Sequence, residues 1–318
     1  MKLATTTGDF GGFTQSLAEN VAFFEGTGFR YLDLSLYRMI YEGSPLLTDE
    51  WERWTAEGAE AAAARGFSFC QSHSPDGDMH QEGEGFDIFL HGTIRSLEVC
   101  AKLGIPHIVV HARDIGGYPS RENRRLNLER NRRFFEKLFP TMDKTGVRVL
   151  LENTCDNHAP TPQENRRHFP ATAAELLELQ EFLNHPLLGI CWDTGHAHMQ
   201  SLDQYDSIME LGSNLKALHV VDNRGDDDSH TAPYQGSVNF DSVMQGLLDS
   251  GYQGFFTFEA MNILHNSNSW PHYRKEWIYR GEKVEKLAIV PLELKRQAIA
   301  LLYQIGRHIL ETYGCYEE

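Results

Sequence analysis

Residues 188–199 read LGICWDTGHAHM, a short apolar segment that ends on Asp193 and runs directly into a turn with two histidines. An apolar run of this length, bounded by polar residues, is typical of a strand buried on both faces of a parallel sheet. The stretch before it, TAAELLELQEFLNH, has the apolar spacing of a helix. Together they predict one unit of an alternating helix and strand fold.

The same unit recurs along the chain. Eight β-rich segments start about 30 to 40 residues apart, the length of a strand plus its crossover helix: KLATTT, YLDLSL, FSFCQSH, HIVVHA, VRVLLEN, LGICWD, ALHVVD and GFFTFEA. No GxGxxG or GxxxxGK[ST] phosphate turn follows any of them. We therefore predict a closed (β/α)₈ TIM barrel, an α/β fold forming a single domain over residues 1–318, rather than an open doubly wound sheet.

The composition limits the class of protein and its partners. Hydrophobic residues make up 41% and charged residues 23% of the chain, as in ordinary soluble globular proteins. The amino terminus lacks the apolar core of a secretory signal, and no run approaches the roughly 20 apolar residues that span a bilayer. The five cysteines form no CxxC pair, which fits reduced thiols, and the formal net charge of −16 disfavours nucleic acid. We expect a cytoplasmic protein with no membrane or nucleic-acid partner.

Side chains able to bind a metal stand at the ends of six predicted strands. They are His73, His111, Glu152, Asp193, His219 and Glu259. Because the carboxyl ends of barrel strands form one mouth, these side chains should converge there. A single histidine beside an apolar strand is more often a hydrogen-bonded structural group. Six such groups together are hard to explain as packing, since unpaired buried acids are costly and a divalent cation would remove that cost.

The first candidate is a single ion held by three carboxylates and one imidazole: Glu152, Asp193, His219 and Glu259. Oxygen-rich ligation with one nitrogen suits Mn²⁺ first, and Mg²⁺ or Co²⁺ as well, better than a structural zinc. Four protein ligands also leave room in the coordination shell for substrate oxygens. We expect His196 to turn towards the metal or the substrate, and His198 to lie on the following helix away from it.

A second stretch, DDDSHTAPYQGSVNF at 226–240, follows the seventh predicted strand. By itself an acidic run is more typical of a solvated loop. With His196 as a partner, however, Asp228 and His230 become additional metal or substrate ligands. His73 and His111 belong to the same additional set.

These motifs resemble those of the xylose isomerase-like TIM barrels, which include ketose 3-epimerases, hydroxypyruvate isomerase, inosose dehydratase and type IV apurinic endonucleases. The resemblance covers nearly the whole chain and is carried by LLENT, CWDTGHAH, ALHVVDN, the DxH-x5-G-x-V-x-F stretch at 228–240, and FTFEA. It implies a metal-dependent sugar isomerase or epimerase in which Glu152 and Glu259 face each other across a ketose and transfer a proton through a cis-enediolate. It further implies that His196 contacts a substrate oxygen and that Arg224 holds hydroxyls.

Other activities within the resemblance stay open. A lyase or dehydratase acting on a keto-sugar or inosose would share the proton abstraction and then expel a leaving group. A zinc-dependent apurinic endonuclease would bind three zinc ions, His73 and His111 sharing Glu152 with one of them, and His196, Asp228 and His230 enclosing another. The net charge counts against a duplex substrate, and the basic segment RENRRLNLERNRR at 121–133 has the spacing of a solvated helix face. A sugar-sensing protein without turnover would not need two opposed glutamates.

A long segment at about 262–290 follows the eighth predicted strand. Its aromatic residues, Trp270 foremost, suit an active-site loop that closes over a small polyol and excludes water. A contact between subunits of a homo-oligomer is the alternative. No phosphate cradle accompanies the segment, so phosphorylation of the sugar is left open.

Overall fold

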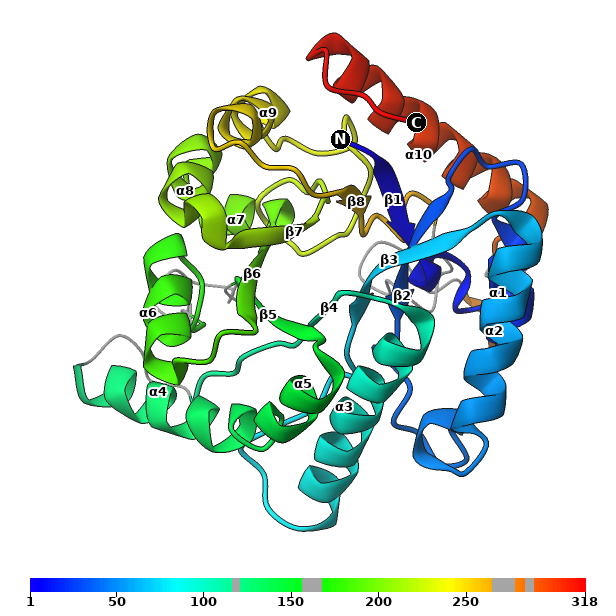
Figure 1. The fold of residues 1–318 in the computed structure, drawn as a ribbon. Coiled ribbons are helices and arrows are strands. Elements are labelled where there is room, and N and C mark those ends of the chain that lie inside the picture. The colour runs from blue at the N-terminus through cyan, green and yellow to red at the C-terminus, as the bar shows by residue number, and fades with distance from the viewer. Residues whose placement is uncertain (116–120, 156–167, 265–277, 284–288) are drawn as a thin grey trace.

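The computed structural model describes residues 1–115, 121–155, 168–264, 278–283 and 289–318. Eight parallel strands form one sheet in the order β7-β6-β5-β4-β3-β2-β1-β8. Their bounds are Leu3–Thr6 (β1), Tyr31–Ser35 (β2), Ser68–His73 (β3), His107–Val109 (β4), Arg148–Glu152 (β5), Leu188–Asp193 (β6), Leu215–His219 (β7) and Phe256–Phe258 (β8). The helices surround this sheet (Figure 1), so the prediction of a TIM barrel is confirmed.

The barrel closes between β7 and β8. There the ladder is reduced to one parallel bridge, Val220 with Phe258. Val220 N donates to Thr257 O at 2.8 Å, and Glu259 N donates to Val220 O at 3.2 Å. These two bonds continue the sheet around the circle and place Glu259 beside the end of β7.

The connecting helices are Leu17–Phe23 (α1), Trp51–Arg65 (α2), Glu84–Leu103 (α3), Arg121–Phe135 (α4), Phe139–Thr145 (α5), Ala173–Leu183 (α6), Thr194–Met199 (α7), Gln204–Leu211 (α8), Phe240–Asp249 (α9) and Leu292–Thr312 (α10). Short 3₁₀ helices lie at Thr7–Phe10 (η1), Pro45–Leu47 (η2) and Gly212–Asn214 (η3), and a small hairpin pairs Ile278–Tyr279 (β9) with Glu282–Lys283 (β10). The local sequence explains where several of these helices begin or end. Thr172 and Glu175 form a capping box at the start of α6, and Gly104 takes the left-handed conformation that ends α3.

Two strands end earlier than the sequence predicts. The ladders of β4 with both neighbours stop at Val109, paired with His73 and with Leu150. His111 therefore lies two residues beyond the strand, on the segment leading out of the barrel. Glu259 likewise lies one residue beyond Phe258, the last residue of β8. Both still reach the mouth, because Val110 N donates to Leu150 O and Glu259 N to Val220 O.

The basic segment 121–133 lies on α4, as predicted. Among the described residues, three of its arginines form ion pairs with glutamates: Arg124 with Glu178, Arg125 with Glu129 and Arg132 with Glu136. The opposite face of α4 is buried. There Asn131 accepts from Arg113 N at 3.0 Å, which ties the segment after His111 to the helix.

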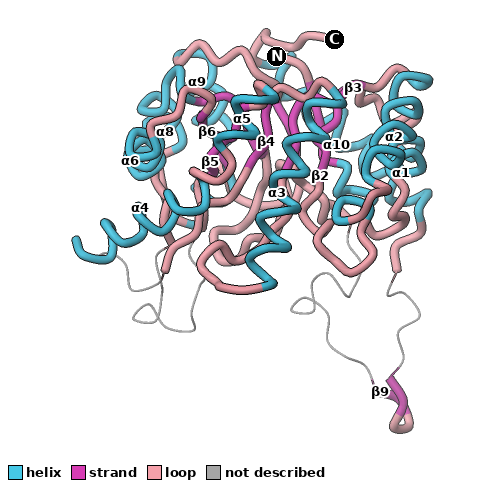
Figure 2. The backbone as a smooth tube through the Cα atoms, turned by 60° about the horizontal axis from the view of Figure 1, so that its bottom comes forward, coloured by secondary structure: helices cyan, strands magenta, loops and turns pink. Residues whose placement is uncertain are grey.

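The barrel interior is layered. One small apolar layer consists of Val109, Leu150, Cys191 and Ala217. Side chains of a strand alternate between its two faces, so the residues two positions further along the same strands point to the same side. These are the predicted ligands Glu152, Asp193 and His219 on β5 to β7 and His111 just beyond β4, which form the next layer. Both termini lie at one end of the barrel (Figure 2), where Glu317 N donates to Met1 O.

Within the described ranges, no helix combines the length and the apolar character that crossing a membrane requires. All five cysteines are free thiols.

Candidate metal and catalytic site

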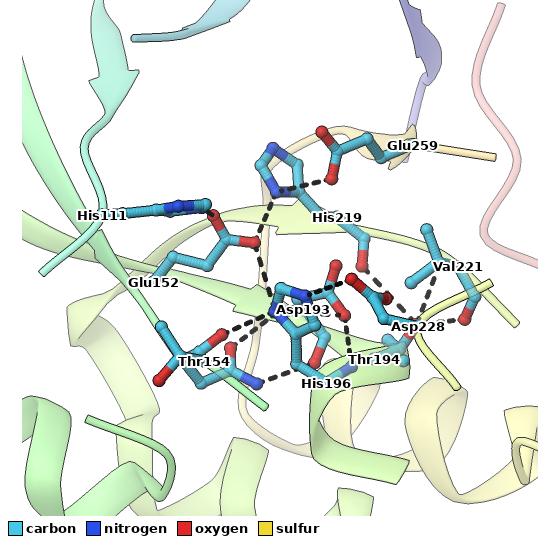
Figure 3. Close-up of polar contacts among 12 residues, drawn as sticks. His111, Glu152, Thr154, Asp193, Thr194, His196, His219, Val221, Asp228 and Glu259 are labelled. Carbon is cyan, nitrogen blue, oxygen red and sulfur yellow. Dashed lines mark hydrogen bonds and ion pairs between the residues drawn. The ribbon is translucent and has the colours of Figure 1, made fainter. Parts of the chain in front are cut away.

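Glu152 lies between His111 and His219 (Figure 3), completely buried at the end of β5. One carboxylate oxygen, Oε1, is 2.8 Å from His219 Nδ1, and the other, Oε2, is 2.9 Å from His111 Nε2. The carboxylate therefore bridges two sides of the mouth. Three groups of metal-binding side chains meet around it.

The first group contains Glu152, Asp193, His219 and Glu259, whose ligand atoms all lie within 4.8 Å of one another. Glu259 Oε2 is 3.3 Å from His219 Nδ1. Asp193 Oδ1 accepts from His196 N at 2.6 Å, but Oδ2 is buried with no hydrogen-bond partner among the described residues. A buried carboxylate oxygen without a partner is costly, and this donor set fits a divalent cation.

The second group joins Glu152 to His73 and His111. His73 Nε2 is 3.2 Å from His111 Nε2 and 3.6 Å from Glu152 Oε2. Two ring nitrogens at this separation need a proton or a cation between them, because two lone pairs repel. The Nδ1 atom of His73 bonds to Ser74 O at 2.8 Å, which leaves Nε2 to face the site.

The third group surrounds Asp228. Its Oδ2 atom is 3.3 Å from His196 Nε2 and 3.1 Å from His230 Nε2. The opposite ring nitrogens of the two histidines bond to main-chain carbonyls, His196 Nδ1 to Asn153 O at 2.7 Å and His230 Nδ1 to Glu259 O at 2.9 Å. A carbonyl that fixes one ring nitrogen while the other faces inward is the usual arrangement of a metal-ligating histidine. Cys155 joins His196 and Asp228 within 4.8 Å.

The electrostatics of the mouth show strong coupling between acids and imidazoles. Burial alone would raise the pKa of Glu152, but His219 and His111 outweigh it and hold the pKa well below its usual range. Burial would lower the pKa of His196 and His230, yet the neighbouring acids outweigh it, and the pKa of His230 rises to about 10. Burial raises the pKa of Asp193 to about 6. The buried acids thus require positive charge, which protons on the histidines or a bound cation can supply.

Local sequence holds these groups in place. Asn153 clamps the ends of β5 and β6, since its Nδ2 donates to Asp193 O at 2.9 Å and its Oδ1 accepts from Asp193 N at 2.7 Å. Thr194 Oγ1 donates to Val221 O at 2.7 Å and ties α7 to the segment after β7. A Cβ at Gly195 would stand 2.5 Å from a methyl group of Val221, so only glycine fits there. The ENT and DTGH motifs are thereby explained as backbone clamps around the ligands.

The loop that carries Asp228 and His230 has a comparable clamp. Asp222 accepts from Gly236 N and Val238 N, each at 2.9 Å, and folds the loop back over the mouth. A Cβ at Gly236 would come within 2.2 Å of Asn223 O. The glycine of the motif at 228–240 is therefore a steric requirement.

The predicted residues differ in their relation to this cluster. His198 bonds to Ser237 Oγ at 2.9 Å instead of joining the ligands, as expected. Arg224 is exposed and is not among the described residues that line the cavity, so its predicted contact with substrate hydroxyls stays a prediction. Trp270 and most of the expected loop at 262–290 lie outside the described residues.

Two groups near the site were not predicted from the sequence, the thiol of Cys155 and the carboxylate of Asp33. Cys155 follows Glu152 by three residues, and this spacing was the available signal. Asp33 lies in the middle of β2, completely buried, and neither carboxylate oxygen has a partner in the described parts of the chain. Burial raises the pKa of Asp33 to about 6, opposed by His219 and His73. A lone acid inside an apolar strand pattern gives no local indication that it reaches the site.

The cluster forms part of the floor of a cavity of about 700 Å³. His73, His111, Glu152, His196, Asp228, His230 and Glu259 line it at the mouth of the barrel. A cavity of this volume lies within the range of about 300–1,000 Å³ found for small-molecule sites.

Comparison with known proteins gives a family and several similar proteins. The profile of a family described as "Xylose isomerase-like TIM barrel" matches residues 22–278. Fructoselysine 3-epimerase of Escherichia coli O157:H7 is 27% identical over 124 residues, 39% of this chain and 42% of that protein. Ketose 3-epimerase of Arthrobacter globiformis is 32% identical over 92 residues, 29% of this chain and 30% of that protein. The matches thus span about half or less of the length of these curated relatives. The same holds for a further curated relative, a protein of uncharacterised function.

Solved structures share the fold over almost the whole chain. A D-tagatose 3-epimerase-like protein superposes with a TM-score of 0.68 at 17% identity, covering 99% of this chain and 100% of the other. The 3-keto-D-glucoside 4-epimerase of E. coli gives a TM-score of 0.65 at 17% identity, with 96% and 99% covered. At these identities the likeness establishes the fold.

Proposed function

Because this chain belongs to the xylose isomerase-like TIM barrel family, we propose that it is a divalent-metal-dependent isomerase or epimerase of a sugar or sugar-like polyol. The observation that carries the proposal is the pair Glu152 and Glu259. Both carboxylates contact His219 Nδ1, at 2.8 and 3.3 Å, and both line the same cavity. Two carboxylates that reach one cavity floor can remove and return a proton on a bound substrate. The epimerase relatives support this reaction class.

The residues that would hold the metal are Glu152, Asp193, His219 and Glu259. The Oδ2 atom of Asp193, which has no partner in the described ranges, supports this assignment. So does the oxygen-rich donor set, which favours Mn²⁺ and then Mg²⁺ or Co²⁺. A bound divalent cation would polarise the substrate carbonyl and stabilise negative charge on its oxygen. The protein's own part is to orient the sugar and to move the proton.

In the proposed reaction, one glutamate takes the proton from the carbon beside the carbonyl, and the other returns a proton to the resulting cis-enediolate. His196 is held by Asn153 O with Nε2 towards the cavity, a geometry suited to a substrate oxygen. Expulsion of a leaving group after the same first step would make the enzyme a lyase or dehydratase of a keto-sugar or inosose.

Hydrogen exchange with solvent tests the proposal. The Mn²⁺-loaded protein is incubated in D₂O with a panel of ketoses, keto-sugars and inososes, and the products are analysed by NMR. We expect deuterium at the carbon beside the carbonyl of at least one compound. Absence of deuterium and of elimination products for the whole panel would refute the proposal.

The three adjacent ligand groups favour a second candidate, a zinc-dependent phosphodiesterase of the apurinic endonuclease type. It requires His73 and His111 to share Glu152 with one zinc, and His196, Asp228 and His230 to hold another. About three zinc ions per chain and cleavage of an abasic duplex would support it. One ion per chain after native purification would contradict it.

A further inference from the structure

The cavity continues well beyond the metal cluster. We call the part away from the cluster the distal half and define it by Asp9, Phe13, Asn20, Tyr41, Trp54 and Lys295, which all line the cavity. These residues come from η1, α1, α2 and α10 and from the segments beside them. The distal half therefore lies on the β1 and β2 side of the barrel, and it is continuous with the floor that holds Glu152 and Glu259.

The aromatic residues of the distal half offer mainly ring surface. Trp54 Nε1 donates to Gln15 O at 3.3 Å, and the Tyr41 hydroxyl donates to Gln15 Oε1 at 3.1 Å. Their polar atoms are thus already bonded within the protein. Tyr41 is 38% exposed, so part of its ring is free for a ligand. Aromatic rings beside a cavity pack against the C–H surface of a sugar ring.

Two buried acceptors complement the rings. Asp9 Oδ2 accepts from Thr5 Oγ1 at 2.7 Å, but Oδ1 has no partner in the part of the chain that the structure describes. Asn20 Nδ2 donates to Thr7 O at 3.0 Å, and its Oδ1 is also without a partner there. Both residues are more than nine-tenths buried. Among the described residues, each leaves an acceptor that a donor from a bound ligand could satisfy.

Lys295 limits which donor fits. Its Nζ donates to Met261 O and Leu264 O and so holds the segment after β8 against α10. Lys295 attracts Asp9 electrostatically, and its positive charge would repel a second cation beside Asp9. A neutral hydroxyl therefore suits the acceptors better than an ammonium group. The free oxygens of Asp9 and Asn20 also disfavour a phosphate, because phosphate oxygens are acceptors and carry negative charge like the acid.

From these contacts we propose that the distal half binds a second hydroxylated ring, so that the substrate is a ketose carrying a glycosyl substituent. Phe13, Tyr41 and Trp54 pack against that ring, while Asp9 and Asn20 accept from its hydroxyls. The inference rests on the proposed isomerase or epimerase activity and adds a substrate class to it. A cavity of about 700 Å³ leaves space for such a substituent beside the ring that reacts.

The test compares fructose with glucosylfructoses linked through O1, O4, O5 or O6, all of which leave the hydroxyl at carbon 3 free. The rate of deuterium uptake by the Mn²⁺-loaded protein gives kcat/KM for each sugar. We expect at least one disaccharide to exceed fructose at least tenfold. Equal or lower values for all four disaccharides would overturn the proposal.

Two tryptophans on α2 provide a matched control. Trp54→Leu should lower the ratio of disaccharide to fructose kcat/KM at least fivefold. Trp51→Leu should leave the ratio unchanged, since Trp51 stacks with Arg95 and Lys102 rather than lining the cavity. If Trp54→Leu fails to fold, Tyr41→Ala on the exposed rim serves instead. An unchanged ratio in the folded cavity variant would overturn the proposal.

Measurements of sugar binding distinguish a failure of this inference from a failure of the proposed function. If no sugar exchanges deuterium, the proposed activity is wrong for these compounds, and calorimetry on the Mn²⁺-loaded protein then tests the distal half directly. A disaccharide that binds at least tenfold more tightly than fructose, with the advantage lost in Trp54→Leu, supports the second ring. Equal affinities, or no binding by any disaccharide, refute it.

Discussion

Two neighbouring layers inside the barrel come from the same strands and differ in nearly every physical respect. The lower layer is Val109, Leu150, Cys191 and Ala217, and the upper layer, two residues later, contains Glu152, Asp193 and His219 with His111. The lower layer removes apolar surface from water and stabilises the fold directly. The upper layer buries acids, which is favourable only when positive charge compensates them. One strand register therefore serves both stability and function, and single substitutions can separate the two.

The largest expected effect comes from removing the charge of Glu152 while keeping its shape. Glu152→Gln should lower the rate of deuterium exchange at least about 10³-fold, equivalent to about 4 kcal/mol, because the proposed mechanism uses this carboxylate as both base and ligand. Metal content should fall with it, while circular dichroism and the melting curve stay those of a folded barrel. Full activity in the variant would remove Glu152 from the mechanism.

The matching substitution in the lower layer should affect stability alone. Leu150 is completely buried. Leu150→Ala should lower the free energy of unfolding by about 2–5 kcal/mol, because the cavity it leaves is only partly refilled. Urea denaturation measures the loss. Leu248→Ala, at a side chain 39% exposed on α9, should lose less than about 0.5 kcal/mol, and similar losses in the two variants would contradict the assignment of Leu150 to the core.

Asp33 tests whether an acid below the mouth destabilises the fold. Burial raises its pKa from 3.8 to about 6, so between these values the folded state binds more protons than the unfolded state. The contribution of Asp33 to stability should therefore fall as the pH rises from about 4 to 6 and stay lower above. Asp33→Asn should remove this loss and raise the free energy of unfolding of the metal-free protein by up to about 3 kcal/mol at pH 7.

The control for Asp33→Asn is the same comparison of variant and parent at low pH. As the pH falls below the unfolded-state value of 3.8, the acid becomes protonated in both states, so the stabilities of the variant and the parent should converge. Urea titrations at pH 3.5 and pH 7 give the comparison. A gain that is the same at both values would assign the effect to packing rather than to charge.

Much of the barrel could be predicted because its information is local. The eight strands recur at a regular interval, and an acid or histidine directly after an apolar strand must emerge at the mouth, which is why Glu152, Asp193 and His219 were found. The exact end of β4 was not predicted, since it depends on pairing with β3 and β5. No residue near His111 encodes where those ladders stop.

The positions of the remaining residues relative to the site could not be predicted, because these residues come together only when the barrel closes. Asp9 and Lys295 lie near opposite ends of the chain and approach each other where β8 pairs with β1. Asp33 sits in the middle of an apolar strand, and its position beneath the mouth depends on the register of β2 with Thr6 and Gln71. Long-range register of this kind is a property of the folded sheet rather than of any short motif.

The smallest effect separates two histidines on one six-residue helix. His196 faces Asp228 and the cavity, whereas His198 bonds to Ser237 outside it. His196→Ala should lower the exchange rate about 10- to 100-fold, and His198→Ala should change it less than about twofold. Elemental analysis of the metal content then distinguishes the two roles proposed for His196. If His196 only contacts substrate, metal content stays constant as activity falls; if it holds a further ion, one equivalent is lost. Equal losses in the two variants would show that α7 acts through its fold rather than through the side chain of His196.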